Sequence, residues 1–230
     1  MSVEVPETVE DVVGALGGAG AVVIAGGTQV MPRLNTEVTG IGMLVSLRRA
    51  GLAGIAVERS GGEASGRDRS DDATVGAATT LAQLGADDRL AFLRPVVESI
   101  ASPSIRNLAT VGGNLFVGQP YGDLAVALLA LDAEADLAGA DAATRAVEEL
   151  VHDVPPAGGV VTAVRFAIPQ TFRYVKAMRR RLNSGSIVTV AAALTVEDGT
   201  VTAARIALGG AGPAPRRAPS AEAALVGGPL

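Results

Sequence analysis

The sequence contains no cysteine and only one histidine, His152. The absence of cysteine excludes a disulfide framework, a thiol nucleophile and an iron–sulfur cluster held by this chain alone. One histidine cannot build a histidine-rich metal site, and the polar, proline-flanked stretch around His152 favours a solvated loop. If electrons reach this protein through a cluster, another polypeptide must carry that cluster.

Aromatic residues, basic tracts and long apolar segments are also scarce. Aromatics make up 3% of the 230 residues and the net charge is −5, so nucleic acid would find few stacking platforms and no basic surface. No run approaches the ~20 apolar residues of a membrane span, and the first residues are acidic, unlike a secretory signal. With 48% hydrophobic residues, we expect a globular, cytoplasmic protein of one or two domains.

Two glycine pairs organise the chain. The first stands in Ala25-Gly26-Gly27-Thr28-Gln29, directly after an apolar strand-like run, and the second in Thr110-Val111-Gly112-Gly113-Asn114. Because glycine takes positive φ and has no Cβ, such turns let backbone N–H groups approach a ligand. Two of them could form a nest of donors around a pyrophosphate, with the hydroxyls of Thr28 and Thr110. Two tight turns without a ligand would give the same pattern.

A third glycine cluster, at residues 14–20, does not form a dinucleotide fingerprint. The GxGxxG motif must follow a strand and open a helix, whereas this cluster ends a predicted helix and leads into a strand. That helix is indicated by Val9, Val12, Val13 and Leu16 at helical spacing.

Other segments have clear patterns. We predict strands at 21–25, 43–47, 74–77, 160–169, 187–194 and 201–208, and helices starting near 31 and 80, over 92–101, from 123 to 131 and at 221–225. Residues 132–156 should hold a strand, a turn and a short helix. Asp198-Gly199 is a strong hairpin signal, and the polar stretch 59–72 reads as a mobile hairpin connection.

The sequence resembles the FAD-binding medium subunit of the molybdenum hydroxylases, the family of carbon monoxide dehydrogenase and xanthine dehydrogenase. The resemblance rests on AGGTQ, ASPSIRNLATVGGNL and GDLAVALLALDAEADL, and runs from about Pro6 to Val226. It implies an α+β fold: a two-subdomain FAD-binding domain of the PCMH (vanillyl-alcohol oxidase-like) type at residues 1–169, then a shortened α+β C-terminal domain at 170–230.

The resemblance also implies which residues contact FAD. These are the two glycine segments together with Ile100, Asp123, Val160 and Lys176, of which Asp123 and Lys176 would lie near the flavin ring. A cation at Lys176 could stabilise the reduced flavin. The sequence allows other roles as well: Asp123 could cap a helix, and Val160 could be an ordinary core valine.

Several arginines have two interpretations. Arg106, next to the second glycine pair, could bind an anion or could be a structural arginine bonded to loop carbonyls. Arg179, Arg180 and Arg181 could be a solvated or subunit-facing basic patch.

No nucleophile paired with a base and no metal set is evident, so the chemistry would belong to the cofactor. By resemblance the protein is an FAD-dependent oxidoreductase subunit. It would take electrons from the [2Fe-2S] clusters of a small subunit, which receive them from a molybdopterin-binding large subunit, and pass them to NAD, a quinone or dioxygen. A stand-alone FAD-dependent oxidoreductase and a flavin-free scaffold are the alternatives.

Overall fold

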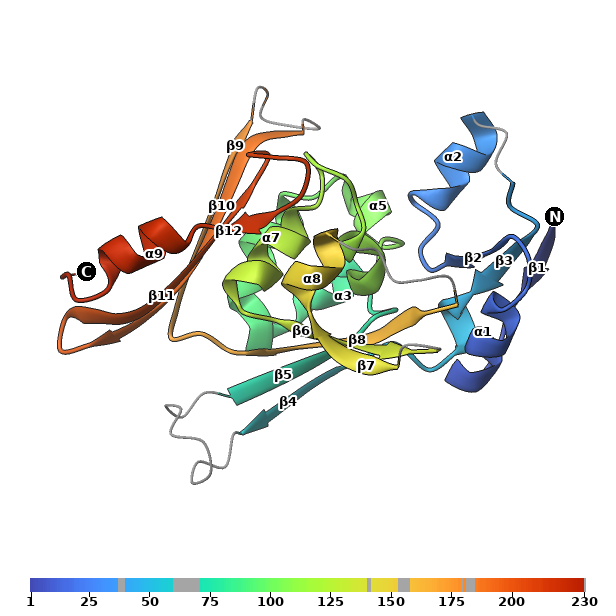
Figure 1. Ribbon diagram of the computed structural model, residues 1–230, viewed down its shortest axis with the longest axis horizontal. Coiled ribbons are helices and arrows are strands. Elements are labelled where there is room, and N and C mark those ends of the chain that lie inside the picture. Colours follow the sequence, from blue (N-terminus) through green and yellow to red (C-terminus); the bar gives the residue numbers. More distant parts are fainter. Residues whose placement is uncertain are drawn as a thin grey trace.

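The computed structural model describes residues 1–36, 40–59, 71–139, 142–152, 158–178, 180 and 185–229. In these residues the strands form three sheets that follow one another along the chain, from the N-terminal sheet to the C-terminal sheet at opposite ends of the molecule (Figure 1). The helix at residues 123–130 lies between the middle and C-terminal sheets (Figure 1). The predicted connection at 59–72 and the basic patch at 179–181 fall largely outside the described residues.

The N-terminal sheet is parallel, with the order β1-β3-β2. Its strands are β1 (Ser2–Glu4), β2 (Ala21–Ile24) and β3 (Met43–Ser46), and its helices are α1 (Val9–Leu16), α2 (Val30–Thr36) and the 3₁₀ turn η1 (Leu47–Arg49). Thr8 caps α1 by accepting from the N–H of Asp11, and Val12 and Leu16 are buried one turn apart. The helix predicted at this position is confirmed.

The middle sheet is antiparallel, with the order β4-β5-β8-β6-β7. Its strands are β4 (Ile55–Arg59), β5 (Asp71–Gly76), β6 (Glu134–Ala138), β7 (Ala143–Ala146) and β8 (Val160–Ala167). The helices that follow β5 are α3 (Leu81–Ala86), η2 (Asp88–Leu93), α4 (Arg94–Glu98), α5 (Pro103–Arg106), α6 (Val111–Leu115), α7 (Asp123–Ala130) and, after β7, α8 (Val147–His152). All eight residues of α7 are buried, so this helix is the centre of the core.

The C-terminal sheet is antiparallel and has the order β12-β11-β10-β9. It comprises β9 (Thr171–Met178), β10 (Ser186–Glu197), β11 (Thr200–Gly209) and β12 (Arg216–Arg217), followed by α9 (Pro219–Leu225). The predicted hairpin is confirmed: Asp198 and Gly199 join β10 to β11 with φ of 49° and 76°. Phe172, Ala191 and Ala207 share one core cluster with α7, so a boundary near residue 170 separates sheets but not hydrophobic cores.

Two local predictions were wrong. The helix expected over 92–101 has other bounds: residues 92 and 93 end the 3₁₀ segment η2, the α-helix α4 covers only Arg94–Glu98, and Ala101 beyond it has the non-helical φ of 47°. His152 is not in a loop but ends α8, although it is exposed as expected. No helix in the described ranges is long and apolar enough to cross a membrane.

Candidate cofactor site

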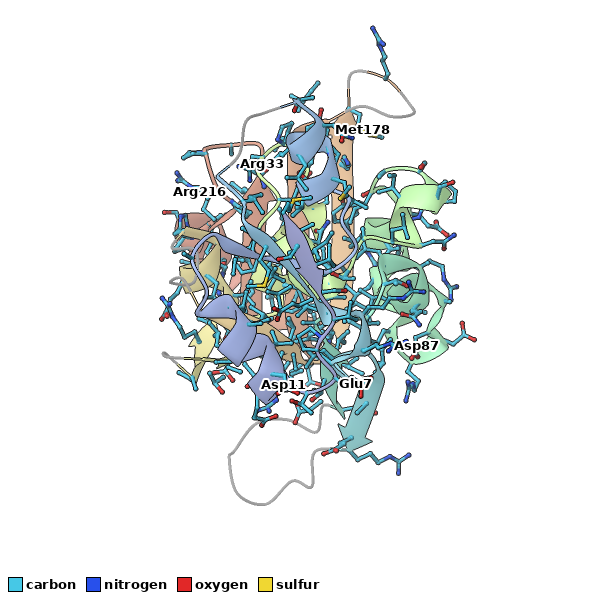
Figure 2. The ribbon with its side chains drawn as sticks, turned by 90° about the vertical axis from the view of Figure 1, so that its right-hand side faces the viewer. Glu7, Asp11, Arg33, Asp87, Met178 and Arg216 are labelled. Atoms are coloured by element: carbon cyan, nitrogen blue, oxygen red, sulfur yellow. The ribbon has the colours of Figure 1, made fainter. Side chains whose placement is uncertain are left out.

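A pocket of about 330 Å³ lies between the N-terminal and middle sheets. Ten predicted cofactor residues line it: Ala25, Gly26, Gly27, Thr28, Gln29, Thr110, Gly112, Gly113, Asn114 and Val160. Arg33 of α2 also lines it, and Figure 2 shows this helix on the face that carries the N-terminal sheet. The fold therefore brings together two glycine segments that are more than eighty residues apart in the sequence.

The first glycine segment is a turn between β2 and α2. Gly27 has a φ of +71°, the left-handed conformation that favours glycine, and its carbonyl accepts from the N–H of Met31 at 2.9 Å. Gly26 packs so closely on the Leu108 carbonyl that a Cβ there would overlap it. The first segment thus touches the chain leading into the second.

The backbone N–H groups of the first segment are available to a ligand. Across the described residues, no hydrogen bond is donated by the N–H of Gly26, Gly27, Thr28 or Gln29. Adjacent N–H donors at a turn before a helix form the kind of concave site that binds phosphate. The first glycine pair thus lines the pocket with residues whose backbone N–H groups donate no hydrogen bond within the described residues, and their contact with a ligand stays a prediction.

The second glycine segment is not the positive-φ turn that the sequence predicted. It forms α6, with Thr110 as the N-cap residue accepting from the N–H of Gly113 at 3.2 Å. Neither Gly112 nor Gly113 has a positive φ. Position 112 requires glycine because α6 packs closely on Ala77: a Cβ at Gly112 would lie 2.8 Å from the Ala77 Cβ.

The N–H groups of Val111 to Asn114 in the second segment are already used inside the protein. Those of Val111 and Gly112 donate to the carbonyls of Thr79 and Ala77, both at 2.9 Å, and that of Asn114 donates to the Thr110 carbonyl at 2.9 Å. The expectation that both glycine pairs supply free backbone donors is therefore met by the first pair alone. The second pair supplies a close-packed wall.

Asn114 adds one unsatisfied atom to this wall. Its side chain is buried, and its Oδ1 has no hydrogen-bond partner in the part of the chain that the structure describes. An unpaired buried acceptor is costly unless a ligand completes it. A ribose or ribityl hydroxyl is a suitable donor, while Val23 and Val160 offer apolar surface to a ring. The residues present thus fit a dinucleotide such as FAD.

Four predicted residues do not line this pocket. Val111 and Ile100 are buried in the main core cluster, with 2% and 6% of their surface exposed. Asp123, the first residue of α7, and Lys176, on β9, meet instead where α7 packs on the C-terminal sheet. A flavin contact at these four positions stays a prediction of the family resemblance.

Asp123 and Lys176 form a buried ion pair. Lys176 Nζ donates to Asp123 Oδ2 at 2.7 Å and to the Ser99 carbonyl at 3.0 Å, and Thr189 Oγ1 donates to Asp123 Oδ1 at 2.8 Å. The two charged side chains are 2% and 5% exposed. The capping interpretation of Asp123 is wrong, because Gly122 is the N-cap residue of α7 and the carboxylate is used in this pair.

Tyr174 belongs to the same cluster. Its hydroxyl lies 2.7 Å from Ser99 Oγ. Burial of the phenol, and secondly the nearby carboxylate of Asp123, raise the pKa of Tyr174 above its ordinary value. This polar cluster joins α7 and the end of α4 to strands β9 and β10. Its members are Asp123, Lys176, Thr189, Ser99 and Tyr174.

Of the two interpretations of Arg106, the structure supports that of a structural arginine bonded to loop carbonyls. Its Nη1 donates to the carbonyls of Ile100 at 2.8 Å and Ala101 at 2.9 Å, at the bend where the backbone reverses after α4. The interpretation as a structural arginine is confirmed.

Sequence reasoning did not find Arg33, Ser99 or Thr189. Arg33 follows the first glycine pair on the next helix, so its spacing was a usable signal for a pocket residue. Ser99 and Thr189 had no such signal, because they reach Lys176 and Asp123 only after the C-terminal sheet docks.

Comparisons with known proteins agree with this architecture. Residues 1–170 match the model of the FAD binding domain in molybdopterin dehydrogenase, and residues 173–230 match the CO dehydrogenase flavoprotein C-terminal domain. The carbon monoxide dehydrogenase medium chain of Afipia carboxidovorans is 30% identical, over 96% of this chain and 78% of the relative. The xanthine dehydrogenase FAD-binding subunit of Escherichia coli O157:H7 is 27% identical, over 91% of this chain and 73% of the relative.

Solved structures give the same result. The Cu,Mo-CO dehydrogenase in its cyanide-inactivated form matches with a TM-score of 0.86 and 29% identity, over 99% of this chain and 81% of that chain. Quinoline 2-oxidoreductase from Pseudomonas putida 86 matches with a TM-score of 0.86 and 26% identity, over 100% of this chain and 81% of that chain.

Proposed function

The chain belongs to the family of FAD-binding domains of molybdopterin dehydrogenases, and from this premise we propose that it is the FAD-carrying, electron-transferring subunit of such a dehydrogenase. The observation that carries the proposal is the pocket itself. The residues Gly26 to Gln29, whose backbone N–H groups donate no hydrogen bond within the described residues, line the same pocket as Gly112, Gly113 and Asn114. This arrangement supports a diphosphate held at the first turn and a hydroxyl held at Asn114.

The chain's own residues bind and orient the cofactor. The backbone at Gly26–Gln29 holds the phosphates, Gly112 lets α6 pack on Ala77 beneath them, and Val160 closes one apolar side. When bound, FAD accepts two electrons and releases them to a second acceptor. No metal-ligating cluster of three or more His, Cys, Asp or Glu side chains occurs among the described residues. A role in electron relay, with substrate oxidation on another chain, is consistent with this composition.

The partners we propose are a molybdopterin-binding large subunit and a small subunit with two [2Fe-2S] clusters. The relatives support partners in general, since one is called a medium chain and another is subunit alpha of the 6-hydroxypseudooxynicotine dehydrogenase complex of Paenarthrobacter nicotinovorans. NAD, a quinone and dioxygen are the candidate acceptors. The same relatives favour a subunit of a complex over a stand-alone oxidoreductase.

The test begins with the purified chain. We expect one FAD per chain, identified by chromatography after release, and no reduction of this flavin when organic substrates are added to the chain alone. Reduction should follow when a chemically reduced protein with two [2Fe-2S] clusters, of the small-subunit type proposed as the partner, is added. Rapid flavin reduction by a metabolite without any partner would establish the stand-alone enzyme and refute the relay.

A further inference from the structure

The wall of the cofactor pocket carries one charged side chain among the described residues, that of Arg33. The other described residues that line the pocket are apolar or uncharged, and no carboxylate is among them. The same pocket is lined by Gly26–Gln29, whose N–H groups donate no described hydrogen bond, and by Asn114, whose buried Oδ1 has no described partner. The described wall therefore presents a positive charge and hydrogen-bonding groups to a ligand.

Arg33 lies on α2, the helix that follows the first glycine segment (Figure 2). Val30 and Arg33 both line the pocket and are three residues apart, so they share one face of this helix. Side chains in a helix lean toward its N-terminus, which directs that of Arg33 toward the turn at Gly26–Gln29. The hydrogen bond from the N–H of Met31 to the Gly27 carbonyl, at 2.9 Å, holds α2 to that turn. The guanidinium thus belongs to the same side of the pocket as the backbone donors.

Two other cations that the sequence suggested for a ligand are used elsewhere. Arg106 donates to the carbonyls of the bend after α4, and Lys176 is paired with Asp123. Neither is among the described residues that line the pocket. Arg33 is therefore the cation that the described part of the chain brings to this wall.

A cation at this position has a clear electrostatic use. The diphosphate of a dinucleotide is an anion near neutral pH, and the protein has a net charge of −5, so a local positive charge favours binding of the ligand. A guanidinium presents its N–H donors in a fixed fork that matches the oxygens of a phosphate group. Because Arg33 is exposed, salt should screen its attraction for an anion. The dependence of binding on ionic strength is therefore a signature of this contact.

We propose that Arg33 pairs with the diphosphate of the dinucleotide bound in this pocket, and that its charge makes the pocket favour phosphorylated ligands over uncharged ones. The inference rests on the proposed function, because it takes FAD as the ligand. It adds a contact to those implied by the family resemblance, which place no cation at the diphosphate.

The experiment is a calorimetric titration of the FAD-free protein with FAD at low and at high salt. Arg33→Gln removes the charge and should raise the Kd for FAD about tenfold at low salt, as expected for one lost hydrogen bond to a charged group. Arg33→Lys keeps the charge without the fork and should raise it less. Added salt should weaken FAD binding by the parent more than by Arg33→Gln. Riboflavin, which has no phosphate, should bind both proteins with the same Kd.

Arg216→Gln is the matched control. Arg216 is exposed like Arg33 but lies on β12 of the C-terminal sheet and does not line the pocket. The control makes the same change in net charge and should leave the Kd for FAD unchanged. Circular dichroism and melting confirm that each variant folds.

Three results would overturn the assignment of Arg33: an unchanged Kd for FAD in Arg33→Gln, an equal increase in Arg216→Gln, or an equal loss of riboflavin binding. The second would show an effect of net charge alone, and the third an effect on the shape of the pocket. A parent that binds no FAD would refute the proposed function itself, and is distinguished by that titration. If Arg33→Gln unfolds the protein, the parent decides: FAD binding that salt leaves unchanged would overturn the pairing.

Discussion

The cofactor pocket and the Asp123–Lys176 cluster both contain buried or half-buried polar groups, but they satisfy them differently. In the cluster, each carboxylate oxygen of Asp123 accepts a hydrogen bond from a side chain of the C-terminal sheet. In the pocket, the N–H groups of Gly26–Gln29 and the Oδ1 of Asn114 have no partner among the described residues. The cluster is complete without a ligand, whereas the pocket keeps polar groups without a partner that the proposed cofactor would bind.

This difference separates a structural role from a binding role without reference to any relative. When one partner of a fully bonded, buried charge pair is removed, the other charge stays buried without compensation, and the folded state is destabilised. Unpaired donors around glycine, by contrast, are retained where a ligand binds. Substitutions in the cluster should therefore change the free energy of unfolding, and substitutions in the pocket should change the affinity for FAD.

Lys176→Met should have the largest effect. It leaves the Asp123 carboxylate buried without its cation, and removing one partner of a buried pair costs about 3–5 kcal/mol in the free energy of unfolding. Urea unfolding of the FAD-free protein measures this loss. The double variant Asp123→Asn with Lys176→Met should be more stable than Lys176→Met alone. A typical hydrogen bond contributes about 1 kcal/mol to the free energy of unfolding. If Lys176→Met changes the free energy of unfolding by no more than this, the ion pair does not hold the sheet in place.

Gly26→Ala should affect both stability and binding. Its new Cβ would overlap the Leu108 carbonyl, so the two segments of the pocket must move apart, at a cost of about 1–3 kcal/mol. Because the two segments that line the pocket move apart, the variant should also retain less FAD than the parent. Gly14→Ala on α1 is the matched control, because apart from its chain neighbours and its own helix backbone nothing lies within 4 Å of its Cβ position, and alanine favours helix. Equal melting temperatures for the two variants would contradict the close contact at Gly26.

Asn114→Asp should act mainly on the cofactor. It keeps the size of the side chain but places a carboxylate in the pocket proposed for the diphosphate, and we expect FAD affinity to fall by about tenfold or more, or at least about 1.4 kcal/mol. Titration of the FAD-free protein measures the change. The exposed Asn107→Asp variant tests whether added negative charge alone is responsible. Unchanged FAD affinity in Asn114→Asp would remove this residue from the cofactor site.

Strong local signals made much of the fold predictable. The capped helix at Val9–Leu16 and the Asp198-Gly199 hairpin depend on neighbouring residues, and both were found from sequence. The second glycine pair was misread, because glycine at 112 is required by packing on Ala77 and not by its φ. Contacts between distant segments had no local signal: Asp123 meets Lys176 and Thr189 across 53 and 66 residues.

The family resemblance supplied what local patterns could not. It added Val160 to the site of the two glycine segments, and Val160 lines the pocket with both of them. It also grouped Asp123 and Lys176, which the structure pairs with each other outside that pocket. Measuring the reduction potential of bound FAD in the Lys176→Met variant would test whether this pair also acts on the flavin.

Tyr174→Phe should have the smallest effect at neutral pH and a distinctive one in alkali. Losing the hydrogen bond to Ser99 costs about 1 kcal/mol. Because folding raises the pKa of Tyr174 above the ordinary value of 10.0, the folded protein keeps a proton that the unfolded chain releases. The stability from this group is present in full below pH 10 and is lost as pH rises further, by up to about 1.4 kcal/mol per pH unit.

Urea unfolding between pH 8 and pH 11.5 should therefore show a steeper decline for the parent than for Tyr174→Phe. Tyr121→Phe is the control, because Tyr121 is 59% exposed and its removal should leave the parent's decline unchanged. Identical declines in the parent and in Tyr174→Phe would mean that the phenol is not held in the cluster. Tyr174 would then be a polar group without a partner, like those in the pocket. The difference between the cluster and the pocket would not hold at this residue.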